Sequence, residues 1–369
     1  MHDTSIRYLI GITMIPGIGS ITARKLIAYS GSAEAVFAEK KKALLNIPDI
    51  GEKVAGAMMT ADVLQQADAE IEYSEKNKIR IITCYDSDYP ERMKQCPDAP
   101  LVLYMRGNAD LNAPKMIGIV GTRHATDYGM EMTANIVRDL ADRGHQPVIV
   151  SGLAYGIDIT AHRAALRAGV PTIGVVAHGL DMLYPAAHRQ TAREMMDNGA
   201  LLTEFCSNTV ADKPLFVRRN RIIAGTTDAT IVVESGVTGG ALITAEYANS
   251  YNRDVFAVPG RTDDIRSQGC NKLIKINKAH LAESAADIEY ILNWSSAQKA
   301  QGIQQQLFFS LSEDEKKIVD LIRQQHEIYI DEICFNTGIP VHKVSSLLLN
   351  LEMNNIVKSL PGRKYKVMA

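Results

Sequence analysis

Between residue 79 and about residue 290, short apolar runs rich in β-branched side chains alternate with longer segments of helical character. The runs are continuously apolar, which is typical of strands that are buried on both faces of a sheet. Because helical segments separate the runs, we expect a doubly wound α/β domain with a mainly parallel sheet over residues 79–292. The predicted strands are Ile79–Thr83, Leu101–Met105, Lys115–Val120, Val148–Val150, Thr172–Val176, Ala200–Thr203, Ala229–Val233 and Val255–Val258.

Residues 1–78 predict a small all-α domain of the helix-hairpin-helix or SAM-like kind. Apolar positions at helical spacing flank the turn Pro16–Gly19, and a weaker copy of this unit surrounds Ile47–Gly51. In a helix-hairpin-helix motif, such glycines let backbone N–H groups approach a DNA phosphate, and Arg24 and Lys25 would reinforce that contact. A tight turn between helices is the favoured interpretation, because acidic residues flank the second turn.

A polar, glutamine-rich stretch predicts a linker over residues 293–309. A third domain over residues 310–369 opens with the capping-box pattern Ser312–Glu315, ahead of apolar residues at helical spacing. Two more helices, Asp331–Asn336 and His342–Asn354, precede a hairpin over Ile356–Val367. Three helices followed by a hairpin predict a winged helix.

The charge balance argues against a polybasic protein that coats duplex DNA, because 40 Lys+Arg stand against 42 Asp+Glu. Any nucleic-acid site must therefore be a local patch. The five cysteines form no C-x-x-C pair and the nine histidines form no H-E-x-x-H motif, so neither a disulfide framework nor a metal site is expected. No run of about 18 apolar residues occurs, and we expect a cytoplasmic protein without a membrane segment.

The segment Ile117–Arg123 is an apolar strand that ends in a glycine turn ahead of a helix. At this place in an α/β sheet, the amides of Gly121 and Thr122, the Thr122 hydroxyl and the Arg123 guanidinium would hold a phosphate. The turn is not a G-x-G-x-x-G fingerprint, and no ribose-binding acid follows it, so a dinucleotide is disfavoured and no cofactor is expected. A purely structural turn is the other interpretation.

Two further glycine turns link strands to helices. The turn Val150–Asp158 leads into a helix with Asp158 and His162 at i and i+4, a spacing that permits an acid–base pair. A capping aspartate and a packed histidine are the favoured interpretation. At the third turn, the amides near Gly239 and Gly240 would hold another phosphate, so that several turns on one rim suit a polyanion.

The densest positive run contains Lys213, Arg218, Arg219 and Arg221, with Phe216 among them. A groove for a single nucleic-acid strand needs cations for the backbone and a flat side chain on which a base stacks. Lys213 and Phe216 supply such a pair. In the alternative interpretation, Phe216 packs in the core and the arginines form salt bridges.

Together these segments resemble the DNA-processing protein A (DprA/Smf) family. The motifs that carry the resemblance, over about residues 85–290, are IGIVGTRHATDYG, VSGLAYGIDITAH, GLDMLYP, RRNRIIAG, VVESGVTGGALITAEYA, and VFAVPG followed by SQGCNKLI. The resemblance implies an extended Rossmann-like fold. It also places the family's G-[ST]-R turn, Gly121–Arg123, on a backbone phosphate and its K-x-x-F pair, Lys213 and Phe216, on the strand and a base.

The resemblance further implies a protein that is not an enzyme. Members bind single-stranded DNA without sequence preference, protect incoming strands and load the RecA recombinase on them in natural transformation. A homodimer is implied, and single-strand-binding protein is a further candidate partner. Arg218, Arg219 and Arg221 are weaker candidates on the same rim. Val217 replaces a frequent proline and would change the angle at which Phe216 presents its ring.

Two other functions stay open at this point. Related Rossmann-like nucleotide phosphoribohydrolases carry a P-G-G-x-G-T-x-x-E loop, which Gly239–Glu246 echoes without the proline and the central glycine. A winged-helix regulator of duplex DNA would place Val341–Asn354 in the major groove, beside a basic strip on the hairpin, Lys358–Lys366. That helix carries few hydrogen-bond donors, which argues against duplex reading.

Overall fold

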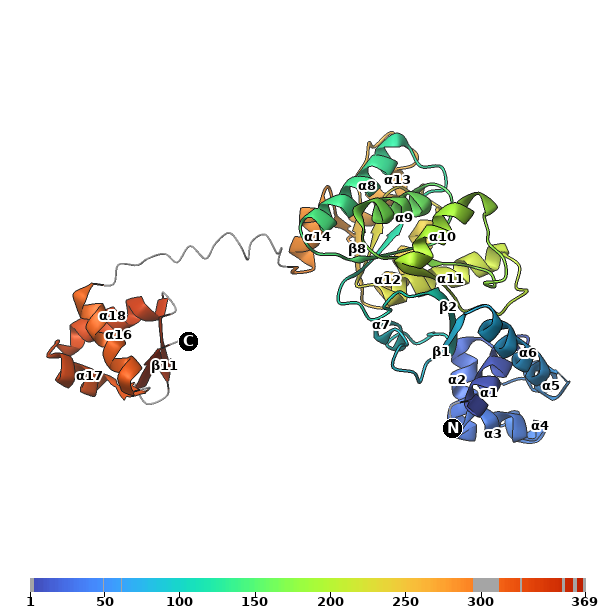
Figure 1. Cartoon of the computed structure of the whole chain (residues 1–369), viewed down its shortest axis with the longest axis horizontal. Helices are drawn as coiled ribbons and strands as arrows, with labels where there is room; N and C mark the ends of the chain where they lie inside the picture. The colour runs from blue at the N-terminus through green and yellow to red at the C-terminus, as the bar shows by residue number, and fades with distance from the viewer. Residues whose placement is uncertain are drawn as a thin grey trace. The chain divides into compact units, whose positions relative to one another are not determined.

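The computed structural model (Figure 1) describes residues 3–48, 50–60, 62–294, 312–325, 327–353, 356–360 and 364–367. The chain divides into two compact units, residues 1–298 and residues 299–369. The predicted linker, residues 293–309, lies outside the described residues from residue 295 onwards.

The first unit is built on a sheet whose described strands follow the order β1-β2-β6-β5-β4-β3-β7-β8-β9. The strands from β6 across to β9 pair in parallel, while β1 and β2 extend one edge in antiparallel orientation. The prediction of a mainly parallel α/β sheet is confirmed. The strands are β1 Arg80–Thr83, β2 Val102–Gly107, β3 Met116–Val120, β4 Val148–Ser151, β5 Thr172–Val175, β6 Gly199–Thr203, β7 Ala229–Val232, β8 Asp254–Ala257 and β9 His280–Leu281.

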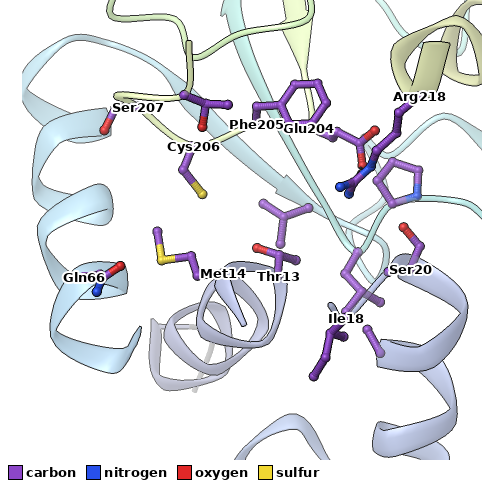
Figure 2. Close-up of a pocket in the computed structure, with 16 residues that line it drawn as sticks. Thr13, Met14, Ile18, Ser20, Gln66, Glu204, Phe205, Cys206, Ser207 and Arg218 are labelled. Atoms are coloured by element: carbon purple, nitrogen blue, oxygen red, sulfur yellow. Dashed lines mark hydrogen bonds and ion pairs between the residues drawn. The ribbon is translucent and has the colours of Figure 1, made fainter. Parts of the chain in front are cut away.

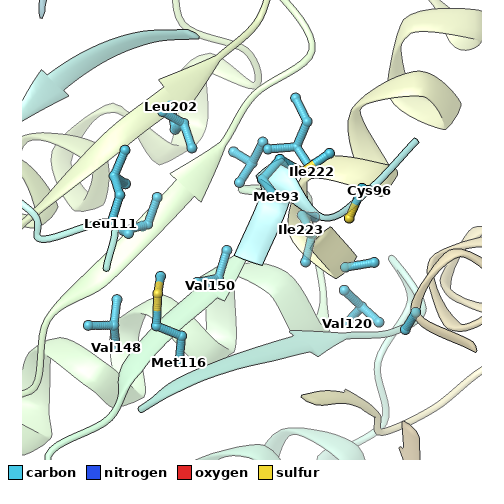
Figure 3. Close-up of a cluster of buried hydrophobic side chains, with 14 of the residues drawn as sticks. Met93, Cys96, Leu111, Met116, Val120, Val148, Val150, Leu202, Ile222 and Ile223 are labelled. Carbon is cyan, nitrogen blue, oxygen red and sulfur yellow. The ribbon is translucent and has the colours of Figure 1, made fainter. Parts of the chain in front are cut away.

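Helices cover both faces of this sheet, because side chains alternate along each strand. Along β3, Met116 and Val120 join one apolar cluster and Ile117 and Ile119 join another. The first cluster includes Ile222 and Ile223 of α11 (Figure 3). It also includes side chains of α12, and the second cluster includes side chains of α8 and α9. The helices of this part are α7 Glu91–Lys94, α8 Asp127–Asp142, α9 Ile157–Ala168, α10 Arg189–Asp197, α11 Lys213–Thr226, α12 Gly240–Ser250, α13 Gln268–Lys275 and α14 Ala285–Ile291, with the 3-10 turn Ala186–His188.

The N-terminal segment is helical, and its apolar core continues into the α/β part. Leu9 and Leu26 belong to the same buried cluster as Tyr104 of β2 and Leu153. Arg24 donates to the carbonyl of Ala99 at 3.3 Å, so this cation serves a contact inside the unit. The helices are α1 Asp3–Met14, α2 Ser20–Ser30, α3 Ala33–Ala38, α4 Lys41–Leu44, α5 Glu52–Thr60 and α6 Val63–Lys76.

The second unit is a winged helix, as predicted. The capping box is present, because Glu315 accepts from the Ser312 amide at 2.9 Å and the Ser312 hydroxyl accepts from the Glu315 amide at 3.3 Å. A strand that the sequence did not reveal, β10, pairs with β12; two residues are too few to show a period. The elements are α16 Glu313–Gln325, β10 Ile328–Tyr329, α17 Ile330–Thr337, α18 Val341–Met353, β11 Val357–Leu360 and β12 Lys364–Val367.

Candidate nucleic-acid interface

A cavity of about 670 Å³ opens at the carboxyl ends of the central strands. Strand β3 has β4 on one side and β7 on the other, so the chain order reverses at β3. This is the topological switch point at which open α/β sheets bind ligands. Among the residues predicted from the sequence, the cavity walls include Gly121, Arg123, Lys213, Phe216, Arg219 and Gly240.

Helix α11 supplies one wall of the cavity through the spacing of its side chains. Asp212 caps the helix, and its carboxylate accepts from the Lys213 amide at 2.6 Å. Lys213, Phe216 and Arg219 follow at intervals of three, which places them along one side of the helix. All three line the cavity, so the helical period selects which residues of the basic run reach it.

Phe216 lies between cations. The Arg123 guanidinium carbon is 5.1 Å from the centre of the Phe216 ring, and that of Arg219 is 5.9 Å from it. These distances fall within the range of cation–π attraction. Arg123 and Lys213 are exposed, and neither forms an ion pair within the described part of the chain. Both positive charges are therefore available to an anion in the cavity.

Arg219 is a buried cation at the floor of the cavity. It donates to the Val175 carbonyl at 2.8 Å, and burial lowers its pKa to about 10. The Arg219 guanidinium and the Asp158 carboxylate both lie against Gly152, so close that a Cβ at this position would overlap both groups. Burial also raises the pKa of Asp158, an effect that the charge of Arg219 opposes. Arg219 stays charged at neutral pH, and the Asp158 carboxylate beside it is its counter-charge.

The structure does not bring Arg218 and Arg221 to the cavity, which corrects the expectation that they share its rim. Both point to the other side of α11 and pair with the buried Glu204, at 2.6 Å for Arg218 and 2.5 Å for Arg221. Arg221 is itself buried and also donates to the Asp98 carbonyl. For these two residues, the alternative of arginines in salt bridges describes the structure.

The turn after β3 also differs from the predicted phosphate cradle. The Thr122 amide donates to the Glu234 carbonyl at 2.8 Å, and the Thr122 hydroxyl accepts from the His124 amide at 3.2 Å. The amide is thus not bare as predicted, because the turn is tied to the end of β7. Gly121 allows the turn to pass close to α9, since a Cβ there would overlap the side chain of Ile157.

The two glycines of the third turn, Gly239 and Gly240, line two different cavities. Gly240 opens α12 and lines the cavity, and the N-cap residue Gly239 supplies no side-chain cap to that helix. Gly239 packs against Ser235, where a Cβ would overlap the hydroxyl, and it lines a different hollow beside α13. Of the two glycines, Gly240 is the one that the structure brings to the cavity.

The pair of Asp158 and His162 has the geometry of a packed core. His162 is fully buried, and its Nδ1–H donates to the Thr172 hydroxyl at 2.7 Å, which in turn donates to the Ile149 carbonyl at 2.8 Å. Nε2 has no hydrogen-bond partner in the described part of the chain, and burial lowers the pKa of His162 to about 3. A neutral, enclosed imidazole is not placed for acid–base chemistry on a ligand in the cavity.

A smaller cavity of about 290 Å³ lies between the N-terminal helices and the end of β6 (Figure 2). The predicted hairpin turn faces this cavity, because Ile18, Gly19 and Ser20 line it together with Cys206 and Arg218. Burial raises the pKa of Cys206 to about 11, so its thiol stays protonated at neutral pH. The position of the turn agrees with the favoured interpretation of a turn between helices.

The cavity at the switch point also contains an aromatic side chain that the sequence analysis did not single out. Tyr184 lies with its ring centre 6.1 Å from that of Phe216 and lines the same cavity. It stands in the motif GLDMLYP, where an exposed tyrosine before a proline in a loop is the available signal. Among the described residues, no group of three or more metal-ligating side chains occurs.

Comparison with known proteins places these features in a family. The family model of the DNA recombination-mediator protein A matches residues 80–293, and that of the DprA winged helix domain matches residues 305–363. Protein Smf of Synechocystis is 30% identical over 99% of this chain and 100% of its own. DNA processing protein DprA of Streptococcus pneumoniae is 37% identical over 58% of this chain and 74% of its own.

Two solved structures share the fold. The X-ray structure of DprA from Streptococcus pneumoniae covers 77% of this chain and 97% of its own, with 34% identity and a TM-score of 0.66. The Helicobacter pylori DprA structure, which describes a single-stranded DNA binding mode, covers 58% of this chain and 96% of its own, with 29% identity and a TM-score of 0.52.

The fold and the matches together define a DNA-processing protein with a Rossmann-like core and a winged helix. The chain belongs to the DNA-processing protein A (DprA/Smf) family. None of its described helices has the length and apolar character that crossing a membrane requires.

Proposed function

We propose that this chain binds single-stranded DNA without sequence preference in the cavity at the switch point, and that it does so as a binding protein rather than an enzyme. The observation that carries this proposal is the meeting of two exposed cations, Arg123 and Lys213, which form no ion pair among the described residues, with the half-buried ring of Phe216. Cations contact phosphates and a flat ring stacks on bases, which are the two components of single-strand binding.

Each residue has a distinct part in the proposed site. Arg123 and Lys213 contact backbone phosphates, and Phe216 stacks on a base. Arg219, with Asp158 as its counter-charge, forms the floor beneath them. Gly121 keeps the first turn close to α9, and the open N-terminus of α12 at Gly240 adds a partial positive charge. None of these groups reads the edge of a base, so the binding does not depend on sequence.

Membership of the family supports the wider role. Protection of incoming strands, loading of RecA, a homodimer and a contact with single-strand-binding protein stay predictions from the resemblance. The phosphoribohydrolase alternative has less support, because Gly239 and Glu246 of its loop line a separate hollow and not the cavity at the switch point. A duplex-reading winged helix also stays the weaker interpretation, since α18 carries few hydrogen-bond donors and many leucines.

The test is fluorescence anisotropy of a labelled oligo-dT with the full chain, over a salt series and with duplex DNA as competitor. We expect binding that resists duplex competitor and weakens about tenfold in each of Arg123→Ala and Lys213→Ala, with a smaller salt dependence in both. Arg218→Ala is the matched control, because it removes one cation from the same helix outside the cavity. Equal binding by all four proteins would contradict the proposal.

A further inference from the structure

Tyr184 is an exposed aromatic side chain with little structural reason for its position. It is 47% exposed, and its hydroxyl forms no hydrogen bond among the described residues. Its ring packs at the edge of the cavity, tilted by 58° to the ring of Phe216. Burying a tyrosine ring is favourable, and this ring lies partly open on the wall of a cavity that Arg123 and Lys213 also line, where a ligand can stack on it.

The backbone beneath Tyr184 is held in place. The Tyr184 amide donates to Nε2 of the buried His178 at 3.2 Å, while Nδ1–H of His178 donates to the Gly179 carbonyl at 2.8 Å. Burial lowers the pKa of His178, so the imidazole stays neutral and Nε2 remains an acceptor. A fixed backbone restricts the ring to a few positions and lowers the entropy lost when a ligand stacks on it.

The two rings of the cavity differ in how open they are. The Arg123 guanidinium lies 5.1 Å from the Phe216 ring centre and that of Arg219 lies 5.9 Å from it, so cations already occupy space next to Phe216. No cation lies over Tyr184 among the described cation–π pairs. Tyr184 is therefore the ring of this cavity that a base reaches without displacing a guanidinium.

We infer that Tyr184 is a second base-stacking residue of the single-stranded DNA site, next to Phe216. This inference rests on the proposed function. With ring centres 6.1 Å apart, the two side chains receive neighbouring bases of a strand whose stacking is opened, while Arg123 and Lys213 contact the phosphates. The ring selects for a flat base and adds no charge, so its contribution does not depend on salt.

The first test measures binding of labelled oligo-dT to Tyr184→Ala and Tyr184→Phe. We expect Tyr184→Ala to bind about tenfold more weakly with an unchanged salt dependence, and Tyr184→Phe to bind as the unmodified protein does, because the ring and not the hydroxyl makes the contact. Tyr155→Ala is the matched control. Tyr155 has similar exposure, 49%, and packs on His188, but it does not line the cavity.

The second test is photo-cross-linking with an oligonucleotide that carries 5-iodouracil in place of thymine, followed by mass mapping of the linked peptide. A cross-link at Tyr184 supports the inference. The inference is overturned if Tyr184→Ala binds oligo-dT as tightly as the unmodified protein and the unmodified protein gives no cross-link at Tyr184, while Arg123→Ala still binds more weakly. Equal binding by the unmodified protein, Arg123→Ala and Lys213→Ala would overturn the proposed site itself, which is a distinguishable result. Urea unfolding of Tyr184→Ala shows whether the variant is folded.

Discussion

The two sides of helix α11 use the same residue types for opposite purposes. On one side, Lys213 is exposed, has no ion pair with any residue that the structure describes, and stands near Phe216 at the cavity. On the other side, Arg218 and Arg221 share one buried carboxylate, Glu204. A cation that already has a buried partner gives little to a ligand, whereas an unpaired cation beside an aromatic ring is available. Burial and pairing, rather than charge density along the sequence, separate binding from structure.

The largest expected effect comes from removing Glu204. Glu204→Ala leaves the buried guanidinium of Arg221 without its carboxylate, and breaking a buried pair on one side costs about 3–5 kcal/mol of unfolding free energy. Urea unfolding followed by circular dichroism measures the loss. Affinity of the folded protein for oligo-dT should be retained. A Glu204→Ala variant of unchanged stability would show that the ion pairs of Glu204 with Arg218 and Arg221 do not stabilise the fold.

The next effect is on binding. The double variant Arg123→Ala/Lys213→Ala should bind oligo-dT about a hundredfold more weakly, because each cation neutralises a backbone phosphate. Its unfolding free energy should stay within about 0.5 kcal/mol of that of the unmodified protein, since exposed substitutions away from buried networks have small effects. Anisotropy and urea unfolding on the same preparations measure both quantities. A large loss of stability would mean that these side chains hold the fold.

The buried His162 makes the free energy of unfolding depend on pH. Its folded pKa is about 3 and its ordinary value is 6.5, so the unfolded chain takes up a proton as the pH falls below 6.5 while the folded chain does not. Stability from this group is complete above pH 6.5 and falls by about 2 kcal/mol between pH 7 and pH 5. His162→Gln should lose less stability over this range in unfolding experiments. Parallel profiles for the two proteins would contradict the assignment.

A smaller effect is expected from Arg218. Its side chain is 42% exposed, and Glu204 keeps Arg221 as a partner when Arg218 is removed. Arg218→Ala should therefore cost less than about 1 kcal/mol, as for a partly exposed ion pair. Thermal unfolding of Arg218→Ala and Glu204→Ala measures the two losses of stability. Equal losses would show that Glu204 stabilises the fold mainly through Arg218 and not through Arg221.

The sequence predicted the fold class because its signal is local. Each apolar run that became β1 to β8 is visible on its own, and the glycine turns mark the strand ends. The sequence also predicted that Arg123 and Phe216 belong to one site. It did not predict the pairing of Thr122 with Glu234 or of Arg221 with Glu204. Those contacts join residues far apart in the chain, so only the tertiary structure decides which amide or cation remains free.

Tyr184 was not predicted as a site residue for a related reason. A single tyrosine in a loop carries no periodic signal, and its nearness to Phe216 depends on how the loop after β5 meets α11. The helical period, by contrast, was available from the sequence. Applied to residues 213–221, it separates Lys213, Phe216 and Arg219 from Arg218 and Arg221 once the run is known to be a helix.

The most direct test of the account compares two single substitutions on α11 in one experiment. The affinity for oligo-dT is measured against salt concentration for the unmodified protein, Lys213→Ala and Arg218→Ala. The account predicts that the slope of log K against log salt becomes shallower by about 0.7 in Lys213→Ala, the value for one phosphate contact on a single strand, and stays unchanged in Arg218→Ala. The same slope change in both variants, or in Arg218→Ala alone, would contradict the division of the helix into a binding side and a structural side.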